Sequence, residues 1–482
     1  MAEQGIPEWA SIYIQPGKTV KTKSGKFYLY EQKCHYDKTK KHKNGVTNTY
    51  LGRITKEDGF IPSKTRKAIP TPESVVSKQY GAYAIVSKCC GDILERLKSE
   101  FGDYANLIFV VASLRVFEKT PYSELEDAYF ESYFSVFDKT LPMSKSSLSS
   151  FLYDLARHKD KFKAYMRKDI EDDDTLIFDG TNLLCGSQNI SYSASGYKHG
   201  HNYGSQVCPL YAYSATKRKL VYYRLCEGSV SDAKSLTDLL DEANIKHGIA
   251  LADNGFDSPD NIRGLMRRKT KYIIALRRDS AHVTKDILDD SSRMGSEEKF
   301  VDNHESVFAY EVKDGNGNRI CIYFNQTIAG VETSEYLDKM QKGWKGYTDA
   351  GFGEAKKRFG IFVIKTNHTD MTLQKVYQYY RSRFEIEYSF DTLKNTLNFD
   401  KVYMHSDKSL ESWMFINHIS ITITQRIYDV LKENEVKLSL HGFFRKLRQV
   451  VMQRDIHDSS ERFVLQVVPA KTRKICDKLS LI

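Results

Sequence analysis

Two short apolar segments, each followed at once by an aspartate, most constrain the fold of this chain. Residues 176–178 (Leu-Ile-Phe) lead into Asp179, and residues 249–252 (Ile-Ala-Leu-Ala) lead into Asp253. Runs this short and this apolar are typical of buried strands, and strand ends in an α/β sheet are where ligands bind. An aspartate close to a glycine at such a place is most often a turn residue. The segments therefore predict two strands whose ends either turn or carry a functional carboxylate.

The segments around these two strands complete an α/β pattern. Apolar, β-rich stretches at 207–213 and 220–225 follow the first strand, a helix is expected at about 231–243, and a further strand at 272–276. This order of three strands, a helix, a strand, a helix and a strand resembles an RNase H-like sheet with helices on its faces. The fold class predicted is therefore α/β, with an RNase H-like core.

The remaining pattern divides the chain further. The chain begins with strand-like runs that are separated by turn signals. Apolar residues at helical spacing follow and predict helices. A polar, β-rich stretch with a glycine-asparagine-glycine turn then precedes the last helices. The helical part suits a DNA-binding domain or, equally, a structural bundle. The regions expected are 1–65, a small β-rich domain; 66–170, a helical, DNA-binding domain; 171–279, the first part of the core; 280–370, a β-rich insertion; 371–435, the second part of the core; and 436–482, a basic helical segment.

Charge and composition narrow the functional classes. A net charge of +10 favours a polyanionic partner such as nucleic acid without identifying it. None of the eight cysteines forms a Cys-x-x-Cys pair, which argues against a zinc site. No apolar run reaches the roughly 18 residues of a membrane helix, and no signal-peptide pattern is present, so we expect a cytoplasmic protein without a membrane partner. Nucleotide-binding and serine-hydrolase motifs are also missing from the sequence.

A predicted helix from about 373 to 397 gathers four polar side chains on one stripe. At 100° per residue, these four fall within about 60° of one another. They are Tyr380, Arg383, Glu387 and Lys394. A solvated, charged helix face is the ordinary interpretation. One carboxylate surrounded by tyrosine, arginine and lysine also suits an acid that holds a metal while its neighbours grip phosphate.

Three carboxylates, Asp179, Asp253 and Glu387, then come from two strand ends and one helix. Magnesium is a hard cation that takes oxygen ligands. Two such ions about 3.5 to 4 Å apart activate the attacking oxygen and stabilise the leaving oxygen in phosphoryl transfer. The three acids are therefore candidates for both catalysis and metal binding.

The spacing of the helix residues resembles a known family. The pattern Tyr380-x2-Arg383-x3-Glu387-x6-Lys394 is similar to the Y-R-E-K signature of bacterial insertion-sequence DDE transposases of the IS-four-like group. Residues 253–256 (Asp-Asn-Gly-Phe) resemble the motif around the second acid of that group, and residues 179–182 (Asp-Gly-Thr-Asn) the motif around its first. The resemblance covers about 175–430.

The resemblance implies a fold, a cofactor and a substrate. It implies an RNase H-like core interrupted before the third acid by a β-rich insertion, with two Mg²⁺ or Mn²⁺ ions bound by Asp179, Asp253 and Glu387. Tyr380, Arg383 and Lys394 would contact DNA near the cleavage site. The partner is double-stranded DNA, both transposon terminal inverted repeats and target, and the DNA complex is expected to contain a homodimer. The activity implied is cut-and-paste transposition.

Two further interpretations of the sequence stay open. One is an RNase H-like nuclease that cuts without joining, and the other is a DNA-binding derivative without activity. Some family members close a DNA hairpin, for which prototypes often use a tryptophan in the insertion that stacks a flipped base. Trp344 is the only tryptophan between the second and third acids, and an ordinary packed aromatic is the simpler interpretation of it.

Overall fold

The structure is a computed structural model that describes residues 5–36, 44–62, 75–118, 120–198, 201–228, 232–245, 248–278, 298–315, 317–383, 401–457 and 461–482. Contacts divide the chain into two compact units, residues 1–76 with 454–462, and residues 77–453 with 463–482. Within the described residues, no helix combines the length and apolar character that a membrane span requires.

The first unit is built on a four-stranded antiparallel sheet, as the N-terminal pattern predicted. Its strands follow chain order. The elements are α1 (Glu8–Ser11), β1 (Lys18–Lys23), β2 (Lys26–Tyr36), β3 (Asn44–Thr55) and β4 (Gly59–Pro62). Val20 pairs with Leu29 across β1 and β2, and both are buried in a small core with Ala10 and Ile54. Alternation along the strands therefore places one face on this core and leaves the lysines outside.

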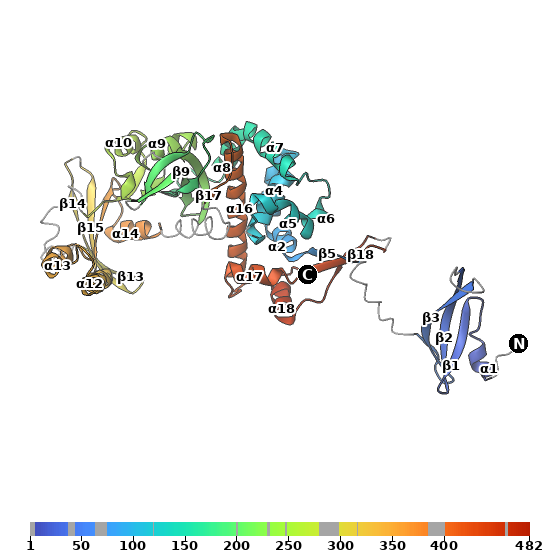
Figure 1. Cartoon of the computed structure of the whole chain (residues 1–482). Helices are drawn as coiled ribbons and strands as arrows, with labels where there is room; N and C mark the ends of the chain where they lie inside the picture. The colour runs from blue at the N-terminus through green and yellow to red at the C-terminus, as the bar shows by residue number, and fades with distance from the viewer. Residues whose placement is uncertain are drawn as a thin grey trace. The chain divides into compact units, whose positions relative to one another are not determined.

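An RNase H-like sheet forms the centre of the second unit, as predicted (Figure 1). Its strands run in the order β10-β9-β6-β11-β12, antiparallel over the first three and parallel over the last three. They are β6 (Thr175–Gly180), β9 (His201–Ser214), β10 (Lys219–Glu227), β11 (Ile249–Ala252) and β12 (Lys271–Ala275), with α9 (Asp232–Glu242) before β11 and α10 (Pro259–Arg267) after it. The first four residues of β6 are buried, which explains their unbroken apolar run, because a strand covered on both faces has no solvent side.

Three short strands extend this sheet beyond β6. They are β7 (Leu183–Cys185), β8 (Ala194–Lys198) and β17 (Lys401–Val402). Both β7 and β8 pair with β9, and β17 pairs with β7 in parallel.

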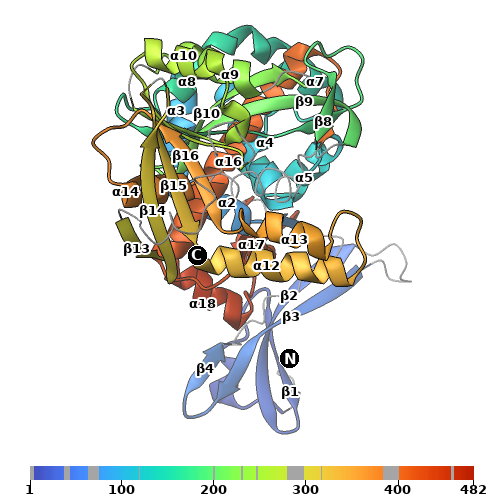
Figure 2. The same cartoon turned by 90° about the vertical axis from the view of Figure 1, so that its left-hand side faces the viewer.

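The insertion between the second and third acids joins the same sheet (Figure 2). Its strand β16 pairs antiparallel with β12, and the order continues β16-β15-β14-β13. The elements are β13 (Glu298–Asp302), β14 (Glu305–Lys313), β15 (Arg319–Asn325), α12 (Gln326–Gln341), α13 (Asp349–Lys356) and β16 (Ile361–Thr366). The β-rich prediction overlooked the two helices. The reason is that Tyr336 is the one buried residue of α12 and α13 buries none, so neither helix has an apolar stripe that a sequence pattern could reveal.

The predicted helical region packs around a helix from the other end of the chain. After β5 (Val75–Gln79) it comprises α2 (Gly81–Cys89), α3 (Gly91–Phe101), α4 (Tyr104–Glu118), α5 (Leu125–Glu131), α6 (Phe134–Phe137), α7 (Lys145–Leu155) and α8 (Lys159–Arg167). Helix α16 (Asp407–Glu433) contacts α2, α4 and α7 and also β10 (Figure 1). All ten residues 412–421 are buried, as expected of a helix covered on every side. The helices and the sheet therefore belong to one unit.

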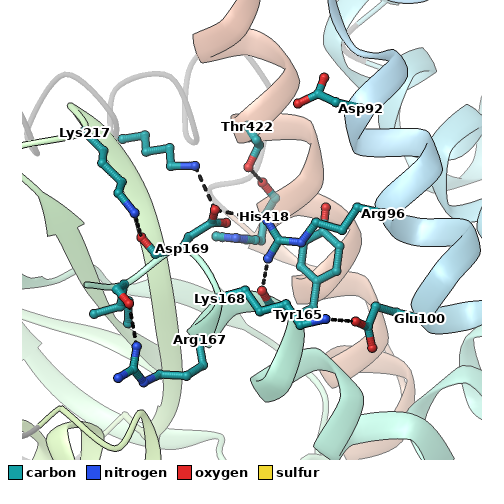
Figure 3. A network of polar contacts seen from close by, with 12 residues as sticks. Asp92, Arg96, Glu100, Tyr165, Arg167, Lys168, Asp169, Lys217, His418 and Thr422 are labelled. Carbon is teal, nitrogen blue, oxygen red and sulfur yellow. Dashed lines mark hydrogen bonds and ion pairs between the residues drawn. The ribbon is translucent and has the colours of Figure 1, made fainter. Parts of the chain in front are cut away.

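Asp169 connects three parts of this unit (Figure 3). Its Oδ1 accepts hydrogen bonds from Arg96 of α3 at 3.0 Å and Lys219 of β10 at 2.9 Å. Burial alone would raise the pKa of this carboxyl, but the two cations outweigh burial and its pKa is lowered. Beside it, His418 of α16 is fully buried, and burial lowers its pKa to about 4.

The last part of the chain departs from its predicted outline in two places. Helix α14 (Leu373–Arg381) ends earlier than the predicted helix at 373–397, and a turn follows at 382–383. The basic C-terminal segment contains strands as well as helices, namely α17 (Leu440–Leu447), β18 (Val451–Asp455), β19 (Val464–Leu465) and α18 (Ala470–Lys478). Pairing of Met452 with Leu465 is a contact between segments that a local pattern does not reveal.

Candidate catalytic site

Asp179 and Asp253 stand at matching positions on adjacent parallel strands. Phe178 of β6 pairs with Ala252 of β11, and each aspartate is the next residue. Asp253 keeps an extended backbone, with φ −80° and ψ −176°. Neighbouring strands lie about 4.8 Å apart, and matched residues of parallel strands point to the same face. The sheet therefore brings the two half-buried carboxylates side by side at its carboxyl edge.

Each carboxylate accepts a hydrogen bond from a backbone N–H one or two residues further along the chain. Asp253 Oδ1 accepts from Gly255 N at 2.8 Å and caps the 3₁₀ turn η4 (Asn254–Phe256). Asp179 Oδ1 accepts from Gly180 N at 3.0 Å. For Asp253 the turn role and the functional role suggested by the sequence are thus compatible, since a carboxylate has about four acceptor positions and the turn occupies one of them, whereas Asp179 lies within β6 and has no turn role.

Arg383 brings a positive charge to this edge. Its Nη1 lies 3.7 Å from Asp253 Oδ2, which is an ion-pair distance but too long for a direct hydrogen bond. The guanidinium lies 5.6 Å from the centre of the Tyr380 ring, within the range of a cation–π contact. Tyr380 is itself buried and packs on Phe362 of β16, with ring centres 4.7 Å apart. In this conformation the tyrosine supports the arginine and is covered from solvent.

The insertion fixes the helix that carries Tyr380. Glu298 of β13 accepts hydrogen bonds from Leu373 N at 3.0 Å and Gln374 N at 2.9 Å. The Thr372 side chain accepts from Lys375 N at 3.2 Å. A carboxylate and a hydroxyl thus satisfy the first N–H groups of α14, where a negative charge also favours the helix dipole. The strands of the insertion therefore help to set the position of α14 beside the acids.

Asp257 is a residue that the sequence analysis missed. It follows the η4 turn, and its Oδ1 lies 3.9 Å from the ammonium of Lys365 on β16. That lysine is nearly buried and also lies 3.6 Å from Asp314 Oδ2. The signal in the sequence was the second acid four residues after Asp253. Because its cation belongs to the insertion, Asp257 links the Asp253 turn to β16.

The other predicted site residues, Glu387 and Lys394, lie outside the described residues. Helix α14 ends at Arg381, and the part of the predicted polar stripe that follows Arg383 lies outside the described residues as well. No group of three histidine, cysteine, aspartate or glutamate side chains forms a metal site within the described ranges. The two aspartates nevertheless fit a hard divalent cation, since they supply adjacent carboxylate oxygens.

Comparison with known proteins identifies the family of this chain. The family described as "Transposase DDE domain" matches residues 170–423, more than half of the chain, including both aspartates. No curated protein sequence matches the chain. Among solved structures, a similar one is the cryo-EM structure of the piggyBac transposase synaptic complex with hairpin DNA. It is 11% identical, with 79% of this chain and 81% of that chain covered and a TM-score of 0.38.

Proposed function

Because the chain belongs to the transposase DDE domain family and is thus a DNA transposase, we propose that Asp179, Asp253 and Glu387 form its catalytic site. DDE transposases use divalent metal ions, and the three acids would hold two Mg²⁺ or Mn²⁺ ions. The observation that carries the proposal is the matched register of the two aspartates on β6 and β11. When bound, such ions activate the attacking oxygen and stabilise the leaving oxygen of a phosphodiester.

The protein's own groups orient the acids and the DNA. Gly255 N donates to one oxygen of Asp253, and the other oxygen lies near Arg383. Arg383, 3.7 Å from that second oxygen, would donate to a phosphate of the DNA, for which the forked guanidinium is well shaped. We assign Lys394 the same task and Tyr380 the task of positioning Arg383, because its ring is buried under the guanidinium.

The substrate we propose is the double-stranded DNA of a mobile element. In this proposal a homodimer of the IS-four-like group, acting in the cytoplasm, cuts at terminal inverted repeats and joins the ends to target DNA. The net charge of +10 supports a polyanionic partner. The core contributes acids and phosphate contacts, which carry no sequence information. We therefore assign recognition of the ends to the N-terminal sheet and the helical region.

The test uses the DNA that flanks the coding sequence. Inverted repeats there define a linear substrate, which is incubated with the full-length protein, Mg²⁺ and a target plasmid. We expect breaks at the repeat ends and joining of those ends to the plasmid. Cleavage without joining would instead identify a nuclease. Binding of the repeats without any cleavage would contradict the proposal and identify a DNA-binding derivative.

A further inference from the structure

The short strand β17 lies beyond the end of β11, on the side of the acids. Val207 of β9 pairs with Leu183 of β7 on one side and with Glu227 of β10 on the other. Since β6 and β10 flank the following part of β9 in the same way, β7 continues the line of β6. On the far side from β9, β11 pairs with β6 and β17 pairs with β7, both in parallel. Strand β17 therefore continues the direction of β11 beyond Asp253, on the same side of the line formed by β6 and β7.

From β17 onward the chain presents a regular polar face. Lys401, Tyr403 and His405 are exposed, whereas Val402 and Met404 between them are buried. This alternation follows from extended backbone, in which successive side chains point to opposite faces. Tyr403 is 67% exposed, which is unusual for a ring of its size. The buried pair anchors the segment while the other three side chains face outward.

These residues line a hollow of about 620 Å³, which we name the Tyr403 groove. Residues Ser187, Gln188 and Asn189 are also part of its lining, and none of the lining residues is acidic. A cube of this volume has an edge of about 8.5 Å, so the hollow has room for about one or two nucleotides.

We propose that the Tyr403 groove binds an unpaired nucleotide of the DNA substrate. The base stacks on Tyr403, the neighbouring phosphate lies at Lys401, and the amide side chains of Gln188 and Asn189 reach the base edge. An aromatic ring combined with a cation is the means by which proteins hold single strands. Bases within a duplex have both faces covered by neighbouring pairs, so an unpaired base is the form that meets this ring. The inference rests on the proposed transposase function.

The position of the groove gives the location of that nucleotide. Lys401 pairs with Leu184, which is five residues after Asp179. At about 3.3 Å per residue this is roughly 16 Å along the strand. Phosphates of one strand follow each other every 3.4 Å along a duplex axis, so 16 Å corresponds to about five of them. The bound nucleotide should therefore lie within about five nucleotides of the cleaved phosphate.

A binding titration tests the stacking contact. Fluorescently labelled (dT)15 is titrated with the full-length protein without divalent metal, at several salt concentrations. Tyr403→Ala should weaken binding about 5- to 150-fold, the loss of one stacked base, whereas Tyr403→Phe should bind like wild type. Lys401→Gln should lower the salt slope by about 0.7. Tyr428→Ala is the matched control, since Tyr428 is an exposed tyrosine of α16. Equal affinity of Tyr403→Ala and wild type would overturn the proposal.

Photo-cross-linking gives a readout that does not depend on the stability of a variant. Substrates carrying 5-iododeoxyuridine at single positions around the cleavage site are irradiated with wild-type protein, and the linked peptide is identified. We expect linkage to the peptide that contains Tyr403 from an unpaired position within about five nucleotides. If all of these DNA positions are cross-linked only to other peptides, the inference about the Tyr403 groove is overturned. DNA cleavage by the same protein would still support the transposase function. A protein that neither binds nor cuts DNA overturns both.

Discussion

The charged groups of Arg115 and Asp169 in the scaffold around α16 are held by close hydrogen bonds, whereas the aspartates at the carboxyl edge of the sheet stay half-exposed. Arg115 of α4 is fully buried and donates to Asn417 Oδ1 at 2.9 Å and Thr120 O at 2.8 Å. The carboxylate of Asp169 likewise accepts hydrogen bonds from two cationic side chains, Arg96 and Lys219. Asp253, by contrast, accepts one backbone N–H and meets its arginine only at 3.7 Å. One region pairs its charges tightly, and the other keeps carboxylate oxygens near the surface.

This difference indicates that the scaffold around α16 contributes mainly to folding stability and the carboxyl edge mainly to the reaction. A buried polar group left without its partner costs about 1 to 3 kcal/mol, so the scaffold contacts contribute to folding. Loosely paired carboxylates contribute little to folding but keep a concentrated negative charge that suits a cation. Substitutions around α16 should therefore change stability, and substitutions at the carboxyl edge should change the rate. Four predictions test this contrast.

The largest effect is expected at the acids. Asp179→Asn, Asp253→Asn and Glu387→Gln each keep the size of the side chain but remove a charge from the proposed metal site. Each should lower Mg²⁺-dependent DNA cleavage on the order of a thousandfold or more, and combining two changes should add little. DNA binding and the melting temperature should not fall. Asp260→Asn is the matched control, because that side chain is 87% exposed on α10. Near wild-type cleavage by any acid variant would remove that residue from the site.

The next effect is a pH dependence that comes from His418. Its pKa is about 4 in the folded protein, because it is buried, and about 6.5 when unfolded. The unfolded chain therefore binds more protons between these values, and stability is lost as the pH falls from 6.5 toward 4. The loss amounts to about 3 kcal/mol. The groups around it are Asp169, Lys219 and Arg96.

Denaturant unfolding between pH 7 and pH 4 measures this contribution. His418→Gln should lack the part of the pH dependence that His418 supplies, whereas His441→Gln, at an exposed position, should keep it. Identical pH profiles for His418→Gln and wild type would show that this histidine is not a buried neutral group.

A smaller effect is expected at Arg383. Arg383→Gln removes a phosphate contact, which should weaken binding of cleaved DNA ends several-fold and lower the salt slope by about one unit. Lys394→Ala should act in the same direction. The measurement is a titration at several salt concentrations. An unchanged slope for both variants would contradict the phosphate role of this pair.

The smallest effect is expected for Tyr380→Phe. The ring packs on Phe362 and supports Arg383, and both contacts depend on the ring and its face. DNA affinity and cleavage should therefore stay within about twofold of wild type, because loss of one hydroxyl leaves the packing volume unchanged. A large loss of affinity with a normal melting temperature would instead indicate that the hydroxyl contacts DNA.

The sequence was most informative where local pattern and tertiary environment agree. The apolar runs before Asp179 and Asp253 predicted strands because both strands are central and covered. The sequence could not reveal that Phe178 and Ala252 share a register, since register is set by pairing across the chain. The helices of the insertion were missed because they bury little. The Tyr403 groove was missed because its wall comes from residues more than 200 positions away.

Metal binding at the carboxyl edge is central to the proposed activity, and iron-directed cleavage of the protein tests it most directly. When hydrogen peroxide and ascorbate are added, Fe²⁺ bound in place of Mg²⁺ reduces the peroxide to hydroxyl radicals, which cut the backbone near the metal, and ascorbate reduces the resulting Fe³⁺ back to Fe²⁺. Wild-type protein should be cut around residues 179–181 and 253–255, since both strand ends lie at the site. Excess Mg²⁺ should suppress both cuts, and Asp253→Asn should abolish them, whereas Asp260→Asn should not. Cuts at other positions only, or cuts that persist in Asp179→Asn and Asp253→Asn, would contradict the account.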